Sequence, residues 1–171
     1  LLDACGLRLL RFDHLVGHQG ALLARAPGDA VPVISPALDL SNGAAAWEKG
    51  RRAASSLPAT VARKGRKLAR ELGPVQLELH SRDHRALEEL LGWKSEQYRR
   101  TGRRDRFADA ATRGLVHDLL DVEEPGFRGA LSLLTVDGRL VAGHFGLRTD
   151  RTLAWWFPTY DTELARYSPG Q

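Results

Sequence analysis

The sequence lacks several features that define common classes of protein. Only one cysteine is present, Cys5, and this excludes an intramolecular disulfide framework. No apolar run approaches the roughly 20 residues that span a bilayer, so we predict no membrane span. No secretory signal is visible, because Asp3 and Arg8 interrupt the first apolar residues. Together these absences favour a reducing, cytoplasmic location.

Motifs of several enzyme classes are absent as well. The sequence contains no Walker loop, no Gly-x-Ser-x-Gly elbow and no Gly-x-Gly-x-x-Gly after an apolar strand. Five histidines show no metal-ligand spacing with Cys5 or with a carboxylate cluster, so we predict no metal site. They are His14, His18, His80, His84 and His117. The sixth, His144, lies in an apolar run, where a lone histidine is more often structural than a catalytic base.

The composition that remains is an ordinary globular balance with local excesses of positive charge. Hydrophobic residues make up 43% and charged residues 27% of the 171-residue chain, which is enough apolar content for a core. The net charge of +4 allows an anionic partner such as a nucleotide, nucleic acid or a membrane surface. Most of the excess lies at 63–70 and 99–106. Because the chain begins with Leu1 and contains no methionine, we interpret it as an internal fragment.

The pattern of apolar residues predicts an α/β fold with a mixed sheet (α+β), in the order strand, helix, helix and three-stranded meander. We expect the first strand at 75–79, helices at 83–101 and 109–122, and meander strands at 130–136, 139–147 and 152–157. Asp137-Gly138 is a two-residue hairpin turn of the type that needs positive φ. The strand at 130–136 is apolar at nearly every position, which predicts cover on both faces of the sheet.

A basic helix is expected before the first strand. Helix formers dominate from 43 to 72, Pro58 opens a new helical segment, and Gly73-Pro74 closes it. On this helix one narrow arc is apolar and the opposite side is basic. The apolar residues are Val61, Leu68 and Leu72, and the basic ones are Arg63, Arg66, Lys67 and Arg70. The basic face is either a solvated surface or a contact surface for a polyanionic substrate or for a carrier's phosphates.

The helix expected at 83–101 places a lysine within its apolar arc. Leu87, Leu90, Leu91 and Tyr98 define this arc, and Lys94 projects from its middle. A buried ammonium group is costly unless it is paired. The position is therefore explained if the arc borders a pocket in which Lys94 meets an anionic ligand or a carboxylate, with Tyr98 beside it. The alternative is a lysine whose stem only covers apolar surface.

The C-terminal residues contain a candidate phosphate site. The last meander strand should lose its neighbour at Pro158, which cannot donate to a ladder. Ser168 is a candidate N-cap, with Pro169 at the first helical position and Gly170 leaving room for a ligand. Such a helix start offers unpaired N–H groups to a phosphate, although Ser-Pro-Gly alone is also typical of a turn.

Aromatic residues gather at the end of the same strand. We expect Trp155 and Trp156 to be core residues, because aromatic side chains in strands bury large areas. Tyr160 and Asp161 follow Pro158 and are expected nearer a cleft.

Five segments carry a resemblance to a known family. They are Arg63-Lys-Gly-Arg-Lys-Leu-Ala-Arg-Glu-Leu-Gly73, Trp93-Lys-Ser-Glu-Gln-Tyr-Arg-Arg-Thr-Gly102, Val136-Asp-Gly-Arg-Leu-Val-Ala-Gly-His144, Trp156-Phe-Pro-Thr-Tyr-Asp161 and Arg166-Tyr-Ser-Pro-Gly170. Their succession resembles the GNAT-like acetyltransferases of bacterial cellulose biosynthesis, the CelD/BcsL group. The match runs along essentially the whole chain, and the combination is more specific than any one segment.

The resemblance implies a two-lobed GNAT architecture related to the Fem aminoacyltransferases. Residues 1–45 would be the end of the first lobe and 46–74 a basic connector. Residues 75–171 would be the opening β-α-α-β-β-β half of a second lobe, truncated at the start of its cofactor-binding helix. The isolated fragment is therefore expected to be inactive.

The resemblance also implies a function. The full-length protein would be an N-acyltransferase that moves an acyl group from acetyl-CoA, or another acyl-CoA, to an amine or hydroxyl of a small-molecule or saccharide-linked acceptor. Arg166, Ser168, Gly170 and Gln171 match the cofactor-binding neighbourhood. Lys94 and Tyr98 match a substrate-binding helix position, and we add Tyr160 as a substrate-binding candidate. No catalytic residue is assigned.

Two alternatives remain open at this stage. A Fem-like enzyme would take its acyl group from aminoacyl-tRNA, and the basic helix would contact the tRNA. A non-catalytic module would use the two basic clusters to bind nucleic acid or a charged polysaccharide, with strongly salt-dependent affinity.

Overall fold

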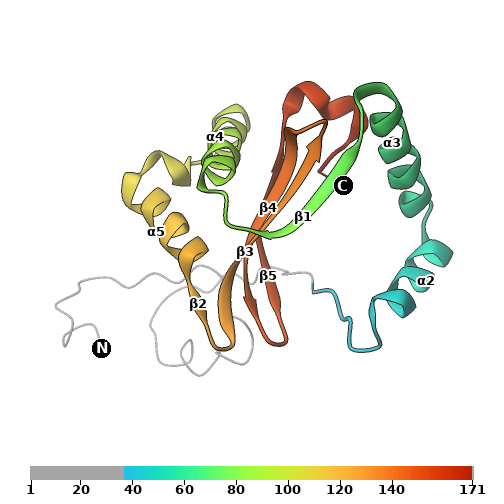
Figure 1. Ribbon diagram of the computed structural model, residues 1–171, viewed down its shortest axis with the longest axis horizontal. Helices are drawn as coiled ribbons and strands as arrows, with labels where there is room; N and C mark the ends of the chain where they lie inside the picture. Colours follow the sequence, from blue (N-terminus) through green and yellow to red (C-terminus); the bar gives the residue numbers. More distant parts are fainter. Residues whose placement is uncertain (1–36, 171) are drawn as a thin grey trace. The chain divides into compact units, whose positions relative to one another are not determined.

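The computed structural model describes residues 37–170 (Figure 1). Cys5, Gln171 and most of the lobe expected at 1–45 lie outside the described residues. The chain divides into two compact units, Leu1–Trp47 and Glu48–Gln171, and helix α2 (Ala44–Ala54) crosses the boundary. The fold described below is that of the second unit.

An antiparallel five-stranded sheet forms the centre of this unit. The order across the sheet is β1, β3, β4, β5, and the short β2 pairs with the start of β3. The strands are β1 (Val75–Ser81), β2 (Glu123–Glu124), β3 (Phe127–Val136), β4 (Arg139–Thr149) and β5 (Leu153–Tyr160). The predicted first strand and meander are confirmed, whereas β2 was not predicted. The α/β fold class is likewise confirmed, although every strand pairing in the described residues is antiparallel and the sheet is therefore not mixed.

Acidic caps set the start of the two helices that connect β1 to the meander. α4 (His84–Arg100) begins after Asp83, whose carboxylate accepts hydrogen bonds from the N–H groups of Arg85 and Ala86 at 2.8 and 3.1 Å. α5 (Ala110–Asp121) begins after Asp109. Both helices are confirmed predictions. The 3₁₀ helix η3 (Arg106–Ala108) between them was not predicted.

Proline and glycine residues set the ends of α3 and the turn between β3 and β4. α3 (Leu57–Leu72) has Pro58 in its first turn and ends at Gly73, where φ is 112°. Asp137 and Gly138 adopt φ of 48° and 77° in the β3–β4 turn, as their sequence predicts. A second 3₁₀ helix that was not predicted, η4 (Thr162–Tyr167), follows β5.

Helices cover both faces of the sheet, with α4 and α5 on one face and α3 on the other (Figure 1). The first core lies beneath α4 and α5 and contains Leu87, Leu90, Leu91, Phe107, Val116, Leu120, Leu131, Leu133, Phe145 and Phe157. The second core lies beneath α3 and contains Leu68, Val136, Val141, Leu164 and Tyr167. The cover predicted for both faces of β3 is therefore confirmed.

Two β-bulges change which strand residues face which helix. Val141 is the extra residue of β4, because Leu134 pairs with Ala142 and Thr135 with Leu140. Trp156 is the extra residue of β5, because Phe145 pairs with Phe157 and Gly146 with Trp155. The prediction that Trp155 and Trp156 are core residues is wrong, since they are 61% and 41% exposed.

β5 does not end at Pro158, which corrects the sequence prediction. The strand stays paired with β4 as far as Tyr160. The N–H of Asp161 donates to the carbonyl of Val141 at 3.0 Å, so residues 159 and 161 direct their backbone groups toward β4. Pro158 and Tyr160 alternate with them and direct their backbone groups to the outer edge. The missing N–H of Pro158 therefore removes no bond to β4.

Candidate functional site

The outer edge of β5 has no strand beside it among the described residues. The carbonyl groups of Pro158 and Tyr160 and the N–H of Tyr160 point to this edge, because they alternate along the strand with residues 159 and 161, which face β4. Unpaired backbone groups at a sheet edge can pair with an extended ligand as they would with a strand. This edge is therefore one element of a candidate site.

Lys94 on α4 reaches this edge. Its Nζ donates to the carbonyl oxygen of Pro158 at 3.2 Å and lies 5.5 Å from the centre of the Tyr98 ring. The side chain is half-buried, and burial together with the charge of Arg103 lowers the pKa of the ammonium group. The predicted carboxylate partner is not found among the described residues. Lys94 is thus a cation with reduced hydration beside a free strand edge.

A polar cavity lies between α4 and the residues at the end of β5. Its volume is about 340 Å³. A stripe along α4 lines one wall, and the β4 start with the residues after Pro158 lines the other. The lining residues are Glu89, Trp93, Glu96, Gln97, Arg100, Arg139, Tyr160, Asp161, Thr162 and Glu163. Lys94 and Tyr98 are not among them.

Some charged side chains of the cavity have ion-pair partners and others have none among the described residues. Arg139 donates to Asp161 at 2.5 Å and to Glu163 at 2.9 Å, and hydrogen bonds to Glu163 and Asp161 raise the pKa of the guanidinium. Glu89 and Glu96 have no hydrogen-bond or ion-pair partner in the part of the chain that is described. The Oε1 atom of Gln97 is buried and also lacks a partner there. The α4 wall therefore offers free acceptors to a ligand that donates hydrogen bonds.

The loop after η4 meets the basic helix α3. Ser168 is the C-cap of η4 and has a left-handed conformation (φ 53°, ψ 52°), so it lacks the extended conformation expected of an N-cap. Its hydroxyl accepts a hydrogen bond from Lys64 Nζ. Gly170 packs against Tyr160, where an added Cβ would lie 2.8 Å from Cδ1 of the ring. The structure thus joins Lys64, Ser168, Gly170 and Tyr160 in one neighbourhood.

Arg166 packs back against Tyr167. Its guanidinium lies 4.7 Å from the ring centre, and Nη2 donates to the phenol oxygen at 2.6 Å. The Tyr167 hydroxyl in turn donates to Glu71 of α3 at 2.8 Å. Lys67 lies 5.8 Å from the same ring centre. Three cationic side chains, Lys64, Lys67 and Arg166, therefore surround the start of the C-terminal loop.

The predicted site residues form two groups. Lys94 and Tyr98 lie together at the β5 edge, and Tyr160 joins Gly170, close to Ser168 and Arg166. Lys64 and the α4 stripe were missed by the sequence reasoning. A signal for the stripe was present, because Glu89, Trp93, Glu96 and Arg100 recur at the spacing of one helix face.

His144 is placed apart from the cavity. Its neighbour Gly143 packs directly against Leu90 of α4, so His144 points to the opposite face of the sheet. It is 5% exposed and lies against Trp155, with ring centroids 3.4 Å apart. Burial lowers its pKa to about 4, which keeps the imidazole neutral at pH 7.

Two other kinds of site are absent from the described residues. Between residues 37 and 170 no helix is both long and apolar enough to cross a membrane. In the same region no three His, Cys, Asp or Glu side chains are grouped so that they could share a metal ion.

The fold and the cavity define an α/β protein with a free strand edge and a polar pocket, an arrangement suited to bringing two small ligands together. The family model described as Acetyltransferase (GNAT) domain matches residues 55–171. The chain therefore belongs to the GNAT acetyltransferase family. A GNAT domain carries acyltransferase activity and typically uses an acyl-CoA donor. A comparison with curated proteins finds no match to the chain.

Proposed function

We propose that the protein containing this chain is an N-acyltransferase that takes its acyl group from acetyl-CoA or another acyl-CoA. The acceptor would be an amine or hydroxyl of a small or saccharide-linked molecule. The resemblance to the CelD/BcsL group links this acceptor to cellulose or exopolysaccharide synthesis. The observation that carries the proposal is the free outer edge of β5 with Lys94 beside it.

The donor site would use the β5 edge and the loop after η4. Three features fit an acyl-CoA there: the outward N–H and carbonyl of Tyr160, a close approach at Gly170, and the cations Lys64, Lys67 and Arg166. The backbone groups of Tyr160 would pair with the amide-bearing pantetheine arm, and the cations would bind the phosphates of the coenzyme. Gln171 stays a predicted cofactor residue outside the described part of the chain.

The acceptor site would be the cavity between α4 and β5. Glu89, Glu96 and Gln97 Oε1 can accept hydrogen bonds from an amine or hydroxyl, and Tyr160 stands between this cavity and the donor loop. Holding both reactants in one site lowers the entropic cost of their reaction.

Transfer would proceed by direct attack. The acceptor nitrogen or oxygen bonds to the acyl carbon, the carbon–sulfur bond breaks, and the acceptor proton leaves through water or a side chain, so that the thiol is released. Negative charge develops on the acyl oxygen. We assign its stabilisation to a backbone N–H of β5, for which Tyr160 is the outward-facing candidate, with Lys94 as a second donor. Tyr98 would position the Lys94 ammonium.

Calorimetric titration of the full-length protein with acetyl-CoA tests the donor site. We expect saturable binding that Lys64→Ala weakens about tenfold, because one charged contact to phosphate is lost. Arg63→Ala is the matched control, since Arg63 is the exposed neighbour of Lys64 on α3. The absence of binding at millimolar acetyl-CoA would refute the assignment of the donor.

The exposed cationic face of α3 supports a second candidate, an aminoacyl-tRNA-dependent transferase. Arg63, Arg66 and Arg70 are exposed along this helix. Incubating the full-length protein with either donor and a panel of acceptors separates the two enzymes. Transfer from aminoacyl-tRNA alone would replace the acyl-CoA proposal.

A further inference from the structure

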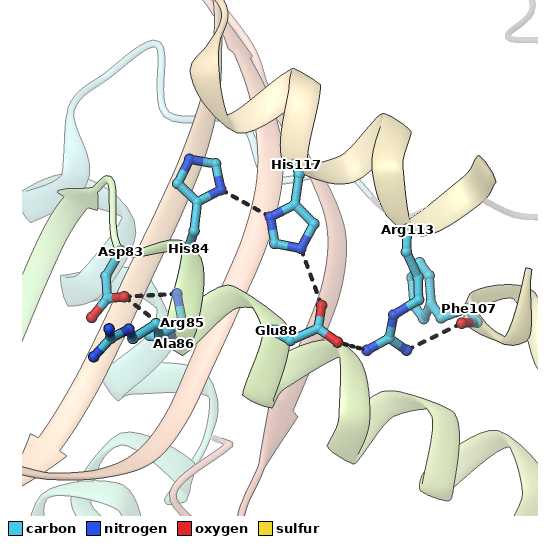
Figure 2. Close-up of polar contacts among 8 residues, drawn as sticks. All are labelled: Asp83, His84, Arg85, Ala86, Glu88, Phe107, Arg113 and His117. Atoms are coloured by element: carbon cyan, nitrogen blue, oxygen red, sulfur yellow. Dashed lines mark hydrogen bonds and ion pairs between the residues drawn. The ribbon is translucent and has the colours of Figure 1, made fainter. Parts of the chain in front are cut away.

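Two histidines face each other between α4 and α5 (Figure 2), and neither lines the cavity. Nδ1 of His84 and Nδ1 of His117 are 2.8 Å apart. The ring centroids are 5.2 Å apart and the planes differ by 16°. With the Nδ1 atoms 2.8 Å apart, a centroid separation of 5.2 Å is about the largest that the size of the two rings allows. The two rings therefore meet edge to edge, with the in-plane Nδ1 positions directed at each other.

Carboxylates hold the outer nitrogen of each ring. Nε2 of His84 lies 2.8 Å from Oδ1 of Asp121, and Nε2 of His117 lies 3.1 Å from Oε2 of Glu88. Arg113 binds the second oxygen of Glu88 (Figure 2). Although burial acts to raise the pKa of Glu88, hydrogen bonds from His117 and Arg113 lower it overall. Glu88 is therefore an ionised acceptor.

These contacts fix the tautomer of both rings. An ionised carboxylate only accepts hydrogen bonds, so each Nε2 must carry a hydrogen. In a neutral imidazole the Nδ1 atom then carries a lone pair. Two lone pairs at 2.8 Å repel each other, and two N–H groups at that distance would collide. The contact needs one cation between the nitrogens.

We propose that His84 and His117 form a two-histidine site for a divalent transition-metal ion of the zinc, copper or nickel type. The ion takes the place of the single proton that otherwise bridges the two Nδ1 atoms. Imidazole nitrogen is a preferred ligand of these ions, and a carboxylate on the far nitrogen of each ring is the usual support of a ligating histidine. Asp121 and Glu88 supply that support here.

The two rings must move to accept the ion. Two nitrogens at a tetrahedral zinc ion lie about 3.3 Å apart when each bond is about 2.0 Å. The Nδ1 atoms would therefore separate by about 0.5 Å, and each ring would turn by about 35° from the edge-to-edge arrangement so that both lone pairs meet at the ion. The side chains of His84 and His117 are 43% and 27% exposed, so water can reach the ion and complete its coordination. With two protein ligands, the site would bind an exchangeable ion.

Metal uptake by the full chain tests the proposal. Equilibrium dialysis against Zn²⁺ or Cu²⁺ should show one equivalent more in the wild type than in His84→Gln or His117→Gln. The control is His80→Asn, which removes an exposed imidazole from β1 and retains a residue type that tolerates the positive φ of 61° at this position. We expect the control to keep the full stoichiometry. Circular dichroism verifies that each variant is folded.

A variant that keeps both imidazoles tests the site even if the histidine variants do not fold. Asp121→Asn should leave the stoichiometry unchanged and weaken the site about tenfold, as expected when the partner of a ligating histidine is lost. Paramagnetic resonance of the Cu²⁺ complex should show coupling to two nitrogens in the wild type.

Two results would overturn the proposal. Equal metal stoichiometry in the wild type and in both histidine variants would place any bound ion elsewhere in the chain. No uptake by the wild type, with nitrogen NMR showing a shared proton at Nδ1, would mean that the proton is the only cation the pair accepts. Neither result depends on acyl transfer.

Discussion

The face of the sheet beneath α4 and α5 and the face beneath α3 use the same strands but are covered unequally. On the first face Leu131, Phe145 and the α4 leucines are fully buried. On the second, α3 and η4 cover only the end that contains Val136 and Val141. Leu77 and Leu79 of β1 belong to this second face, because they pair with Leu134 and Ser132, and they are 65% and 60% exposed.

This difference separates two tasks. The α4/α5 face is a continuous core that packs α4 against the sheet, so it positions Lys94 and the cavity wall. The α3 face joins a small core to a cluster of cations at the C-terminal loop.

The largest expected effect is a difference in stability between two variants, each of which truncates an apolar side chain on one face of the sheet. Phe145→Ala should lower the free energy of unfolding by about 4 kcal/mol, because a fully buried aromatic ring leaves a cavity. Leu77→Ala should change it by less than about 0.5 kcal/mol. Urea denaturation measures both. An equal loss in the two variants would show that the β1 side of the α3 face is covered.

The second prediction concerns the contact between α5 and β3. A Cβ added at Gly129 would lie 2.3 Å from the carbonyl oxygen of Leu119 and 2.9 Å from Cα of Leu120. Because these are backbone atoms, Gly129→Ala should cost about 3 kcal/mol of stability. Gly114→Ala, in open space within α5, should gain about 0.5–1 kcal/mol. Thermal unfolding of both variants checks this, and a neutral Gly129→Ala would argue against close packing.

The third prediction uses pH to probe the α3 face. His144 has a pKa of about 4 in the folded protein and an ordinary value near 6.5 when unfolded, so the unfolded chain takes up the proton first. Stability should be full above pH 6.5 and should fall by about 2–3 kcal/mol as the pH drops to 4. His144→Phe, which keeps a flat ring against Trp155, should lose this part of the slope.

Chemical denaturation at several pH values measures this slope. His80→Asn serves as the control, because His80 is exposed on β1. An unchanged pH slope in His144→Phe would mean that His144 is solvated in the folded protein.

The smallest expected effect lies where α3 meets η4. Tyr167→Phe removes the hydroxyl that donates to Glu71 at 2.8 Å and should cost about 1 kcal/mol. The same change should raise the pKa of Glu71, since this hydrogen bond is the main cause of its lowered value. Carbon NMR of the Glu71 carboxyl group tests the direction. Tyr98→Phe is the control, because the Tyr98 hydroxyl has no partner among the described residues.

Local signals explain why most elements were predictable. Asp83 and Asp109 cap α4 and α5, Pro58 opens α3, Gly73 ends it, and Asp137-Gly138 forms the tight turn. Each of these acts within a few residues along the chain, so a single sequence carries the information. The position of Lys94 in an apolar arc was visible for the same reason.

Features that depend on register or on distant partners were missed or wrongly assigned. The continuation of β5 past Pro158 follows from its alternation against β4, and the exposure of Trp156 follows from a bulge. Lys64 meets Ser168 across 104 positions of sequence. Ser168 ends a 3₁₀ helix because the preceding residues coil against α3.

The amino-acid sequence by itself determined the order of helices and strands, their caps and the family resemblance, since these depend on short-range periodicity and local backbone preference. Tertiary structure alone decided that Tyr160 and the α4 stripe share a cavity, that His84 and His117 meet edge to edge, and that one face of the sheet is covered more fully than the other. Those outcomes depend on strand register and on contacts between residues far apart in the chain, which no local pattern encodes.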